Sequence, residues 1–339
     1  MSNRSRGVVF VCQPLLFQKS GAWRDMLESA GFEVRFPKRG GSVLTEAELL
    51  AELDGVEATI ASTEPYTASI LERAGRLRVI SRTGVGYDSI DTAAATERGI
   101  VVACTPGTNH EAVAEHAFAL LLAVAKRIVP NHAEVTQGGF RRQPSRALRG
   151  RILGLVGLGR IGRAVARRAA AFEMQVLAHD PFVTALTDDA RTVELVALEE
   201  LLARSDIISL HAAATEGTTR LIRRETLARM KQGVLLINTS RGTLVDEAAL
   251  LEALQSGKVA AAGLDVFEHE PPAGSPLLSA PNVVLSPHVA GVDEQAFEDM
   301  AMMATRTIVD LSLGRWPAER LVNADHLPQP WKWNPRSSP

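Results

Sequence analysis

Three short segments in the second half of the chain carry side chains whose combination could do chemistry. They are Arg241 in NTSRG, Glu270 in LDVFEHEP and His288 in SPHVAG. Each segment follows a short apolar run, and in open α/β sheets ligands bind at the carboxyl ends of the strands. The reduction of a 2-oxo acid needs a cation for the carboxylate and the carbonyl oxygen, and a proton donor for that oxygen.

The three residue types meet those needs together. The planar fork of Arg241 matches a carboxylate bidentately, and the imidazole of His288 can donate a proton. Glu270 would orient the imidazole and keep it protonated for reduction. Each residue alone has a simpler interpretation: Arg241 could pair with Asp246 at the surface, Glu270 could be a loop carboxylate, and His288 could be a buried core histidine. The hypothesis therefore rests on their joint placement.

A glycine pattern upstream predicts a dinucleotide site. Gly157, Gly159 and Gly162 have the spacing G-x-G-x-x-G, with Arg160 and Ile161 between the last two glycines. The pattern alone is weak, but here it follows an apolar run and opens an amphipathic helix. The first glycine permits a tight turn, the second lets the backbone approach a pyrophosphate, and the third lets helix and strand pack closely. The helix N-terminus then offers N–H groups to the anion.

Asp180 ends the next apolar run, about 18 residues after Gly162. A carboxylate there can accept hydrogen bonds from the ribose hydroxyls of the adenosine and would repel a 2′-phosphate. No arginine stands beside it to pair a phosphate, so the sequence favours NAD over NADP. The simpler interpretation of Asp180 is a residue that caps a turn or a helix.

Short apolar runs alternate with helix signals along the chain, which predicts an α/β protein with parallel sheets covered by helices on both faces. The expected strands of the first part are residues 8–12, 32–36, 58–62, 77–81 and 100–104. Those of the second part are 151–156, 174–178, 206–211, 234–238, 260–266 and 283–286. Between them, Thr45 and Glu48 predict a capping box, and Gly55 can close that helix.

Two longer helices and a tail complete the pattern. An apolar-rich helix is expected over about 110–128 with Pro130 just beyond it, followed by a basic loop over 137–150. A last helix over about 293–313 would return to the first lobe. The tail 328–339 carries four prolines with Trp331 and Trp333. It either forms a loose end or docks its tryptophans on a neighbouring surface.

Composition narrows the class of protein. With 339 residues, 46% of them hydrophobic, the chain suits two domains with real cores. A formal charge of −2 suggests no nucleic-acid or membrane partner, and the local arginine cluster over 141–151 is most simply a solvated loop. Cys12 and Cys104 lie in apolar runs and are expected to be reduced. No run approaches the ~18 apolar residues of a membrane span, and the N-terminal run is too short for a signal peptide, so a cytoplasmic protein is expected.

Several blocks of the chain, in order, resemble the D-isomer-specific 2-hydroxyacid dehydrogenases, especially their phosphoglycerate dehydrogenase-like branch. From about Ala61 to Asp310 these blocks are RTGVGYDSID, TPGTNHEAVAEH, GLGRIG, INTSRGTLVDEAALLEAL, AAGLDVFEHEP and SPHVAG. The resemblance implies an NAD-dependent oxidoreductase that passes a hydride between nicotinamide and C2 of a small acid of the glycerate, hydroxypyruvate, glyoxylate or phosphoglycerate class. It also implies two Rossmann-like or flavodoxin-like doubly wound lobes with the active site in the cleft between them.

The resemblance assigns roles to further residues. The family's catalytic arginine, glutamate and histidine fall on the three residues named first, and its nicotinamide-contacting aspartate falls on Asp265. His211 and Thr239 match positions that line the ribose and nicotinamide side of the cofactor. We expect no metal site.

On the substrate side, the resemblance implies that Val85 and Gly86 offer backbone N–H groups to the substrate carboxylate and that Arg82 lies nearby. The NAD-binding domain would be residues 105–292, inserted into a substrate-binding domain made of 1–104 and 293–339. The helix over 110–128 and the loop after it resemble the family's dimer contact, so a homodimer is expected.

The chain departs from the family pattern in three places. His211 is followed by two alanines where many relatives have His-x-Pro. Ala61, with Glu64 close by, stands where phosphoglycerate dehydrogenases often carry an arginine for the substrate phosphate. The regulatory domain that many of those enzymes append is not seen. A phosphorylated substrate is therefore left open, with Arg141 or Arg142 able to approach it from a partner subunit.

The sequence is also compatible with two other functions. Formate dehydrogenase is a relative that keeps a glutamine where Glu270 stands, and formate oxidation needs no acid–base pair. A corepressor-like scaffold would keep the fold and use NAD to control assembly, and such a scaffold can retain all three catalytic residues. Turnover of any 2-oxo acid would separate the enzyme from the scaffold.

Overall fold

The computed structural model describes residues 6–186, 192–280 and 282–333, and the chain divides into two compact units. Unit 1 comprises Met1–Asn109 and Glu294–Pro339, and unit 2 comprises His110–Asp293. The sequence predicts domain boundaries after residues 104 and 292. The chain thus leaves unit 1, builds all of unit 2, and returns with its last long helix.

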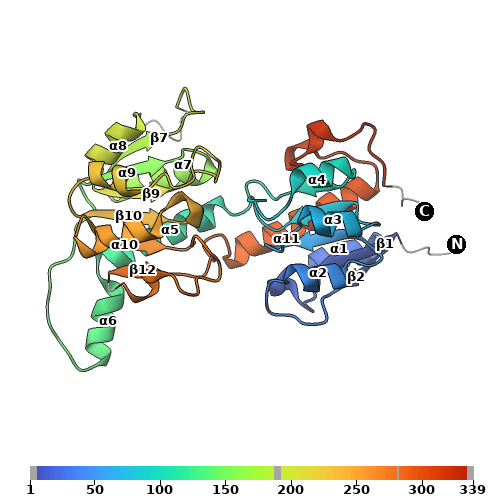
Figure 1. Ribbon diagram of the computed structural model, residues 1–339, viewed down its shortest axis with the longest axis horizontal. Helices are drawn as coiled ribbons and strands as arrows, with labels where there is room; N and C mark the ends of the chain where they lie inside the picture. Colours follow the sequence, from blue (N-terminus) through green and yellow to red (C-terminus); the bar gives the residue numbers. More distant parts are fainter. Residues whose placement is uncertain (1–5, 187–191, 281, 334–339) are drawn as a thin grey trace. The chain divides into compact units, whose positions relative to one another are not determined.

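Unit 1 contains a five-stranded parallel sheet with the order β2-β1-β3-β4-β5 (Figure 1). The strands are β1 (Gly7–Val11), β2 (Phe32–Arg35), β3 (Val56–Ala61), β4 (Val79–Arg82) and β5 (Val101–Ala103). The helices are α1 (Ala22–Ser29), α2 (Glu46–Glu52), α3 (Ala68–Arg73), α4 (Thr92–Glu97) and α11 (Glu294–Ser312). Residues of α2, α3 and α4 share one core cluster with the sheet, and those of α1 and α11 share a second.

The continuous apolar strands follow from this two-sided burial. Along β1, Val9 and Val11 belong to the cluster with α1 and α11, whereas Phe10 belongs to the other cluster. Alternate side chains of a strand point to opposite faces, so a sheet covered on both faces needs apolar residues at every position. The predicted capping box is confirmed: Thr45 Oγ1 accepts from the Glu48 N–H at 3.4 Å and the Glu48 side chain accepts from the Thr45 N–H at 2.9 Å.

The described part of the C-terminal tail docks on unit 1. The Trp331 Nε1–H donates to the Gly99 carbonyl at 2.9 Å, and the Trp333 ring lies edge-on to Phe32 with centroids 5.6 Å apart. Trp316 contacts Trp331, and Trp23 is buried in α1. The tail is therefore no loose end up to residue 333; its residues 334–339 lie outside the described residues.

Unit 2 contains a seven-stranded parallel sheet with the order β12-β11-β10-β9-β6-β7-β8. The strands are β6 (Ile152–Val156), β7 (Gln175–His179), β8 (Val193–Leu195), β9 (Ile207–Leu210), β10 (Val234–Asn238), β11 (Val259–Leu264) and β12 (Val283–Leu285). The helices are α5 (His110–Ala125), α6 (Ile128–Thr136), α7 (Arg160–Ala171), α8 (Leu198–Arg204), α9 (Arg224–Arg229) and α10 (Glu247–Gln255). Residues of α5 and α7 share one core cluster, and those of α8, α9 and α10 share another.

Two elements of unit 2 differ from the expectation. The helix expected over 110–128 ends at Ala125, because Arg127 takes a left-handed conformation with φ 55°, and a separate helix α6 follows. Pro130 lies inside the first turn of α6, where a helix makes no use of the proline's missing N–H. The three-residue edge strand β8 was not expected, since so short a run carries no periodic signal.

Candidate active site

The seven-stranded sheet brings three of the predicted residues to adjoining strand ends. Arg241, Glu270 and His288 follow β10, β11 and β12, which are neighbours in the sheet. Because the strands are parallel, their carboxyl ends lie on one edge, where the loops of such sheets hold ligands. All three residues belong to unit 2.

Glu270 and His288 form a direct pair. The His288 Nδ1 lies 2.7 Å from Glu270 Oε2, and the Phe267 N–H donates to Glu270 Oε1 at 3.1 Å. Burial alone would raise the pKa of Glu270, but the hydrogen bond and charge of His288, the Phe267 N–H and the charge of Arg241 outweigh it and lower that pKa. Glu270 therefore stays ionised and accepts the Nδ1–H of His288, which leaves Nε2 as the outward-acting nitrogen. The side chain of His288 is 36% exposed, so it is no buried core histidine.

Arg241 is held next to the Glu270 loop by a close backbone contact. A Cβ at Gly242 would lie 1.9 Å from the carbonyl carbon of Phe267, so only glycine fits beside that loop. The Asn238 amide donates to the Arg241 carbonyl at 2.9 Å and accepts from the Ser240 N–H at 3.0 Å, which fixes the turn after β10. The Asp246 carboxylate caps α10 through the Ala249 N–H.

Asp265, at the end of β11, is fully buried, and it binds the loop that carries His288. Its carbonyl accepts from the His288 N–H at 2.8 Å. Its carboxylate accepts from the Val289 N–H at 3.0 Å and the Ala290 N–H at 2.8 Å. In this structure Asp265 thus positions the loop of the histidine, whereas the nicotinamide contact implied by the resemblance stays a prediction.

The glycine loop after β6 fits a dinucleotide on geometric grounds. Gly157 has φ +98°, and a Cβ there would lie 2.7 Å from the His211 backbone; a Cβ at Gly162 would lie 2.3 Å from the Gly157 carbonyl oxygen. A Cβ at Gly159 would meet nothing within 4 Å, so a ligand can approach the backbone at this position. Gly159 is the N-cap of α7 and has no side chain to cap it, so the N–H groups of Arg160 and Ile161 in its first turn are available to an anion.

Asp180 lies next to this loop. Its Oδ2 accepts from the Leu158 N–H at 2.8 Å, and its Oδ1 accepts from the Phe182 N–H at 2.9 Å. The carboxylate therefore does cap a turn, as the simpler interpretation held, and it also holds the glycine loop in place. Each oxygen keeps further lone pairs that could accept ribose hydroxyls.

Within the described part of the chain, the buried polar side-chain atoms of this unit that lack a hydrogen-bond partner include Nδ1 of His211 and Oγ1 of Thr239. Burial lowers the pKa of His211 to about 4, so its ring is neutral, and Nε2 lies 2.9 Å from Ser209 Oγ. Buried polar atoms without partners are costly, and a bound ligand would satisfy them. The residues of unit 2 thus fit the nicotinamide dinucleotide that the glycine pattern predicts.

The predicted substrate-side residues follow β4 in unit 1. Val85 and Gly86 are in a loop, and no hydrogen bond among the described residues uses their backbone N–H groups. The Arg82 Nε donates to the Ser62 carbonyl at 2.9 Å. Glu64 is fully buried, and burial raises its pKa. The carboxyl edge of this sheet therefore carries both backbone amide donors and a buried carboxyl group.

No group of three or more histidine, cysteine, aspartate or glutamate side chains suited to a metal ion occurs among the described residues. Within the same residues no helix is long and apolar enough to cross a membrane. Cys12 and Cys104 do not form a disulfide.

The fold and the glycine loop define a two-unit α/β protein with a dinucleotide-binding unit, and comparison with known proteins identifies its family. Residues 118–290 match the family described as the NAD-binding domain of D-isomer-specific 2-hydroxyacid dehydrogenases. The chain is 44% identical over 270 residues to a glyoxylate reductase of Korarchaeum cryptofilum, covering 78% of this chain and 81% of that one. It is 42% identical over 303 residues to a D-3-phosphoglycerate dehydrogenase of Archaeoglobus fulgidus, covering 88% of this chain and 56% of that one.

A solved structure supports the same assignment. The crystal structure of a Thermus thermophilus protein is similar with a TM-score of 0.83 and 40% identity, covering 93% of this chain and 99% of that one. The chain therefore belongs to the D-isomer-specific 2-hydroxyacid dehydrogenase family, and NAD is the cofactor of its matched domain. It spans only about half the length of the phosphoglycerate dehydrogenases it matches.

Proposed function

We propose that the protein is an NAD-dependent D-2-hydroxyacid dehydrogenase that also reduces the matching 2-oxo acid. The observation that carries the proposal is the 2.7 Å contact between His288 Nδ1 and Glu270 at the carboxyl edge of the NAD-binding unit. An ionised carboxylate paired with an imidazole makes a general acid–base group that works near neutral pH. The binding of NAD alone does not require such a pair.

The bound cofactor would supply, as NADH, the hydride that is added to C2 of the oxo acid, and would accept, as NAD⁺, the hydride that is removed from the hydroxy acid. During reduction, the Nε2–H of His288 gives its proton to the carbonyl oxygen as negative charge develops there, and Glu270 stabilises the protonated ring. The guanidinium of Arg241 polarises the same oxygen and binds the substrate carboxylate. We also propose that the backbone N–H groups of Val85 and Gly86 in unit 1 bind the substrate carboxylate.

The substrate class we propose is a small 2-hydroxy or 2-oxo acid of the glycerate, hydroxypyruvate or glyoxylate type. Glyoxylate reductases and phosphoglycerate dehydrogenases are both among the similar proteins. The buried Glu64 and the small Ala61 argue against a phosphorylated acid, because a phosphate needs cations where these two residues stand. Formate oxidation is disfavoured because it would leave the Glu270–His288 pair without a task.

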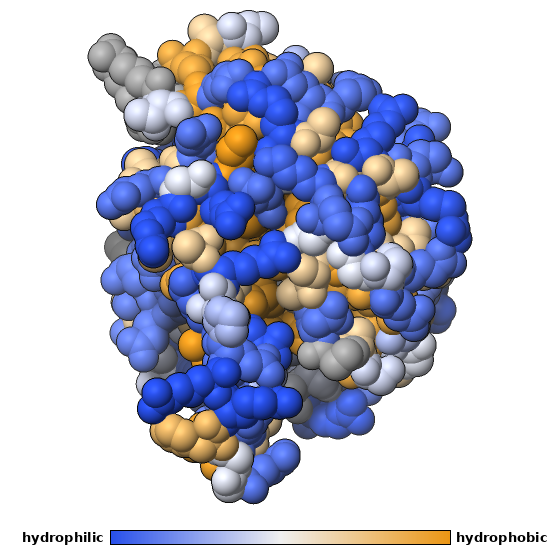
Figure 2. Space-filling view, turned by 90° about the vertical axis from the view of Figure 1, so that its left-hand side faces the viewer, coloured by the Kyte–Doolittle hydropathy of each residue, from blue (hydrophilic) through white to orange (hydrophobic). Residues whose placement is uncertain are grey.

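A homodimer is proposed on the surface of α6 and the segment after it. These project from the rest of unit 2 (Figure 1), and large apolar side chains are exposed there: Ile128 at 55%, Val129 at 52%, Val135 at 58% and Phe140 at 78%. The space-filling view shows a face that is otherwise mostly hydrophilic, with apolar residues in small areas between (Figure 2). Burial of such a patch favours association. We also propose a cytoplasmic location, because the two cysteines do not form a disulfide.

The test is a screen of NADH oxidation with glyoxylate, hydroxypyruvate, 3-phosphohydroxypyruvate, pyruvate and bulkier 2-oxo acids. We expect turnover with one of the small unphosphorylated acids and a loss of about 10²–10⁴-fold in rate for His288→Gln. A matched control is His326→Gln, which changes a histidine of unit 1 that follows the last long helix. Absence of turnover with every acid would refute the enzyme and favour the NAD-sensing scaffold.

A further inference from the structure

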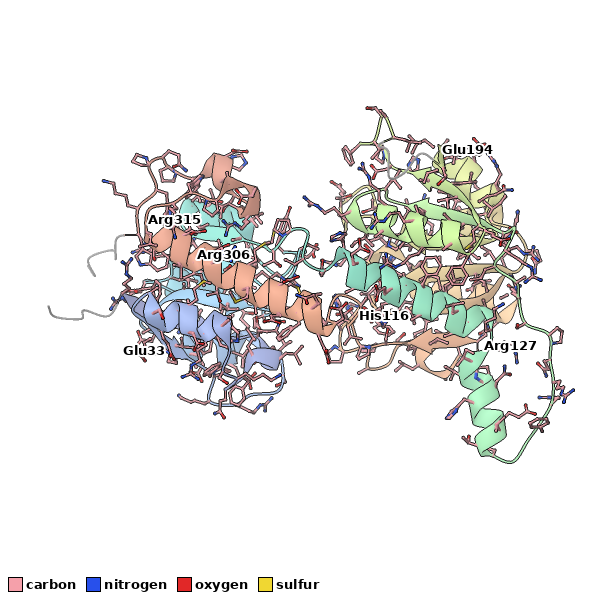
Figure 3. All side chains as sticks on the ribbon, turned by 180° about the vertical axis from the view of Figure 1, so that it is seen from behind. Glu33, His116, Arg127, Glu194, Arg306 and Arg315 are labelled. Atoms are coloured by element: carbon pink, nitrogen blue, oxygen red, sulfur yellow. The ribbon has the colours of Figure 1, made fainter. Side chains whose placement is uncertain are left out.

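The loop that carries His288 is held in place by three hydrogen-bonded side chains, those of Asp265, Ser286 and His116. The Asp265 carboxylate, fully buried, accepts the Val289 and Ala290 N–H groups on one side and the Ser286 hydroxyl on the other, with Ser286 Oγ 2.6 Å from Asp265 Oδ1. His116 on α5 then contacts Ser286, with its Nε2 2.8 Å from Ser286 Oγ. Figure 3 labels His116 on this helix.

The chemistry of the groups fixes the direction of these hydrogen bonds. A carboxylate only accepts, so the Ser286 hydroxyl donates its single hydrogen to Asp265. The Ser286 oxygen must then accept from His116, which places a proton on the His116 Nε2. The sequence of donors is therefore His116 to Ser286 to Asp265. His116 Nε2 also lies 3.5 Å from Asp265 Oδ1, so its proton faces the same carboxylate.

This anchor is needed because the loop holds an unfavourable conformation. His288 has φ 54°, in the left-handed region that side chains other than glycine seldom adopt. Such a conformation persists only when several surrounding contacts hold the backbone in place. Here the residues from Ser286 to Ala290 make four hydrogen bonds to one aspartate: the Ser286 hydroxyl and the Val289 and Ala290 N–H groups to its carboxylate, and the His288 N–H to its carbonyl.

We propose that His116 and Ser286 are positioning residues for the acid–base histidine, acting through Asp265 on the loop that holds His288 against Glu270. This inference rests on the proposed function, since it assigns a purpose to the geometry of that same site. Sequence reasoning missed both residues, although each stands inside a block that resembles the family: His116 in EAVAEH and Ser286 in SPHVAG. Neither residue touches the reacting atoms.

The experiment compares variants that remove a donor with variants that keep one. Ser286→Ala and His116→Leu remove the hydroxyl and the Nε2–H, whereas Ser286→Thr and His116→Gln retain a hydroxyl and an N–H. Ser205→Ala is the matched control: it removes another buried serine hydroxyl of unit 2, which donates to the Leu201 carbonyl at 2.6 Å before the amino end of β9. The readouts are kcat and KM for NADH and for the best 2-oxo acid, and amide hydrogen exchange of residues 286–290.

For Ser286→Ala and His116→Leu we expect kcat to fall about tenfold, while both KM values stay within about twofold. Ser286→Ala removes the hydrogen bond to the Asp265 carboxylate, and His116→Leu removes the donor that orients the Ser286 hydroxyl. The Val289 and Ala290 amides should exchange faster in these two variants. The donor-retaining variants and Ser205→Ala should keep the kcat and the exchange rates of the unmodified protein. Recovery of kcat in the donor-retaining variants, together with an unchanged kcat in Ser205→Ala, would distinguish the loss of this hydrogen bond from a general loss of stability.

The outcomes separate this inference from the proposed function. Unchanged kcat and unchanged exchange in Ser286→Ala would overturn the positioning role, and an equal loss in Ser205→Ala would do the same. If the unmodified protein turns over no 2-oxo acid, the proposed function fails, and the exchange of the 286–290 amides still decides whether Ser286 and His116 hold the loop.

Discussion

The contact between Glu270 and His288 permits a quantitative prediction for Glu270→Gln. The substitution keeps an acceptor oxygen for His288 Nδ1 and removes only the charge. At 2.7 Å, two unit charges interact by about 1.5 kcal/mol in water and by about 6 kcal/mol at an effective dielectric constant of about 20. Because both side chains are 36% exposed, the lower figure applies, and it corresponds to roughly a tenfold loss of kcat.

The assay is steady-state oxidation of NADH with the best 2-oxo acid. The KM for NADH should change by less than about twofold, because Glu270 is not part of the glycine loop. The matched control is Glu268→Gln on the same loop, which breaks a 2.9 Å ion pair with the exposed Arg220. An exposed pair of this kind contributes about 1 kcal/mol or less to stability, so kcat should stay near that of the unmodified protein. Equal kcat for all three proteins would refute the acid–base role of Glu270, and so would an equal loss in both variants.

Arg241, Asp180 and Glu270 each permit a further test by substitution. Arg241→Ala should lower the reduction rate by about 10²–10³-fold with little change in NADH affinity measured by fluorescence titration, and a comparable loss of NADH affinity would contradict its substrate role. Asp180→Ala should weaken NADH binding, because Asp180 also accepts the Leu158 N–H and so holds the glycine loop. The substitution should also narrow the preference for NADH over NADPH, because the carboxylate that would repel a 2′-phosphate is removed. An unchanged ratio of the two dissociation constants would count against the placement of Asp180 beside the ribose. Because the pKa of Glu270 is lowered in the folded protein, its ionised carboxylate stabilises the fold above the ordinary carboxyl range, and this contribution is lost as the pH falls through the lowered pKa. Thermal unfolding of the unmodified protein and of Glu270→Gln should therefore differ near neutral pH and converge in acid, and a constant difference across that range would exclude the linkage.

The sheet, the glycine loop and the ends of the strands could be predicted because their signals are local. Apolar runs mark strands buried on both faces, and the capping box at Thr45 needs only four residues. Arg241, Glu270 and His288 could be associated because each directly follows such a run, and parallel strands gather their ends at one edge.

The features that escaped prediction depend on contacts between distant segments or on single backbone angles. The break between α5 and α6 is caused by one left-handed residue, Arg127, which no pattern announces. The contact of His116 with Ser286 joins residues that are 170 positions apart. Histidine and serine each have many roles in proteins, so only the fold could show that these two meet beside Asp265.

The tail that docks on unit 1 carries two of the four tryptophans, and the location of these residues determines what intrinsic fluorescence can report. All four tryptophans and both tyrosines, Tyr66 and Tyr87, belong to unit 1, whereas the NAD-binding unit contains neither residue type. Intrinsic fluorescence therefore follows the unfolding of unit 1 alone. A melt monitored in this way would miss a separate transition of the NAD-binding unit, which far-ultraviolet circular dichroism or the emission of bound NADH would reveal.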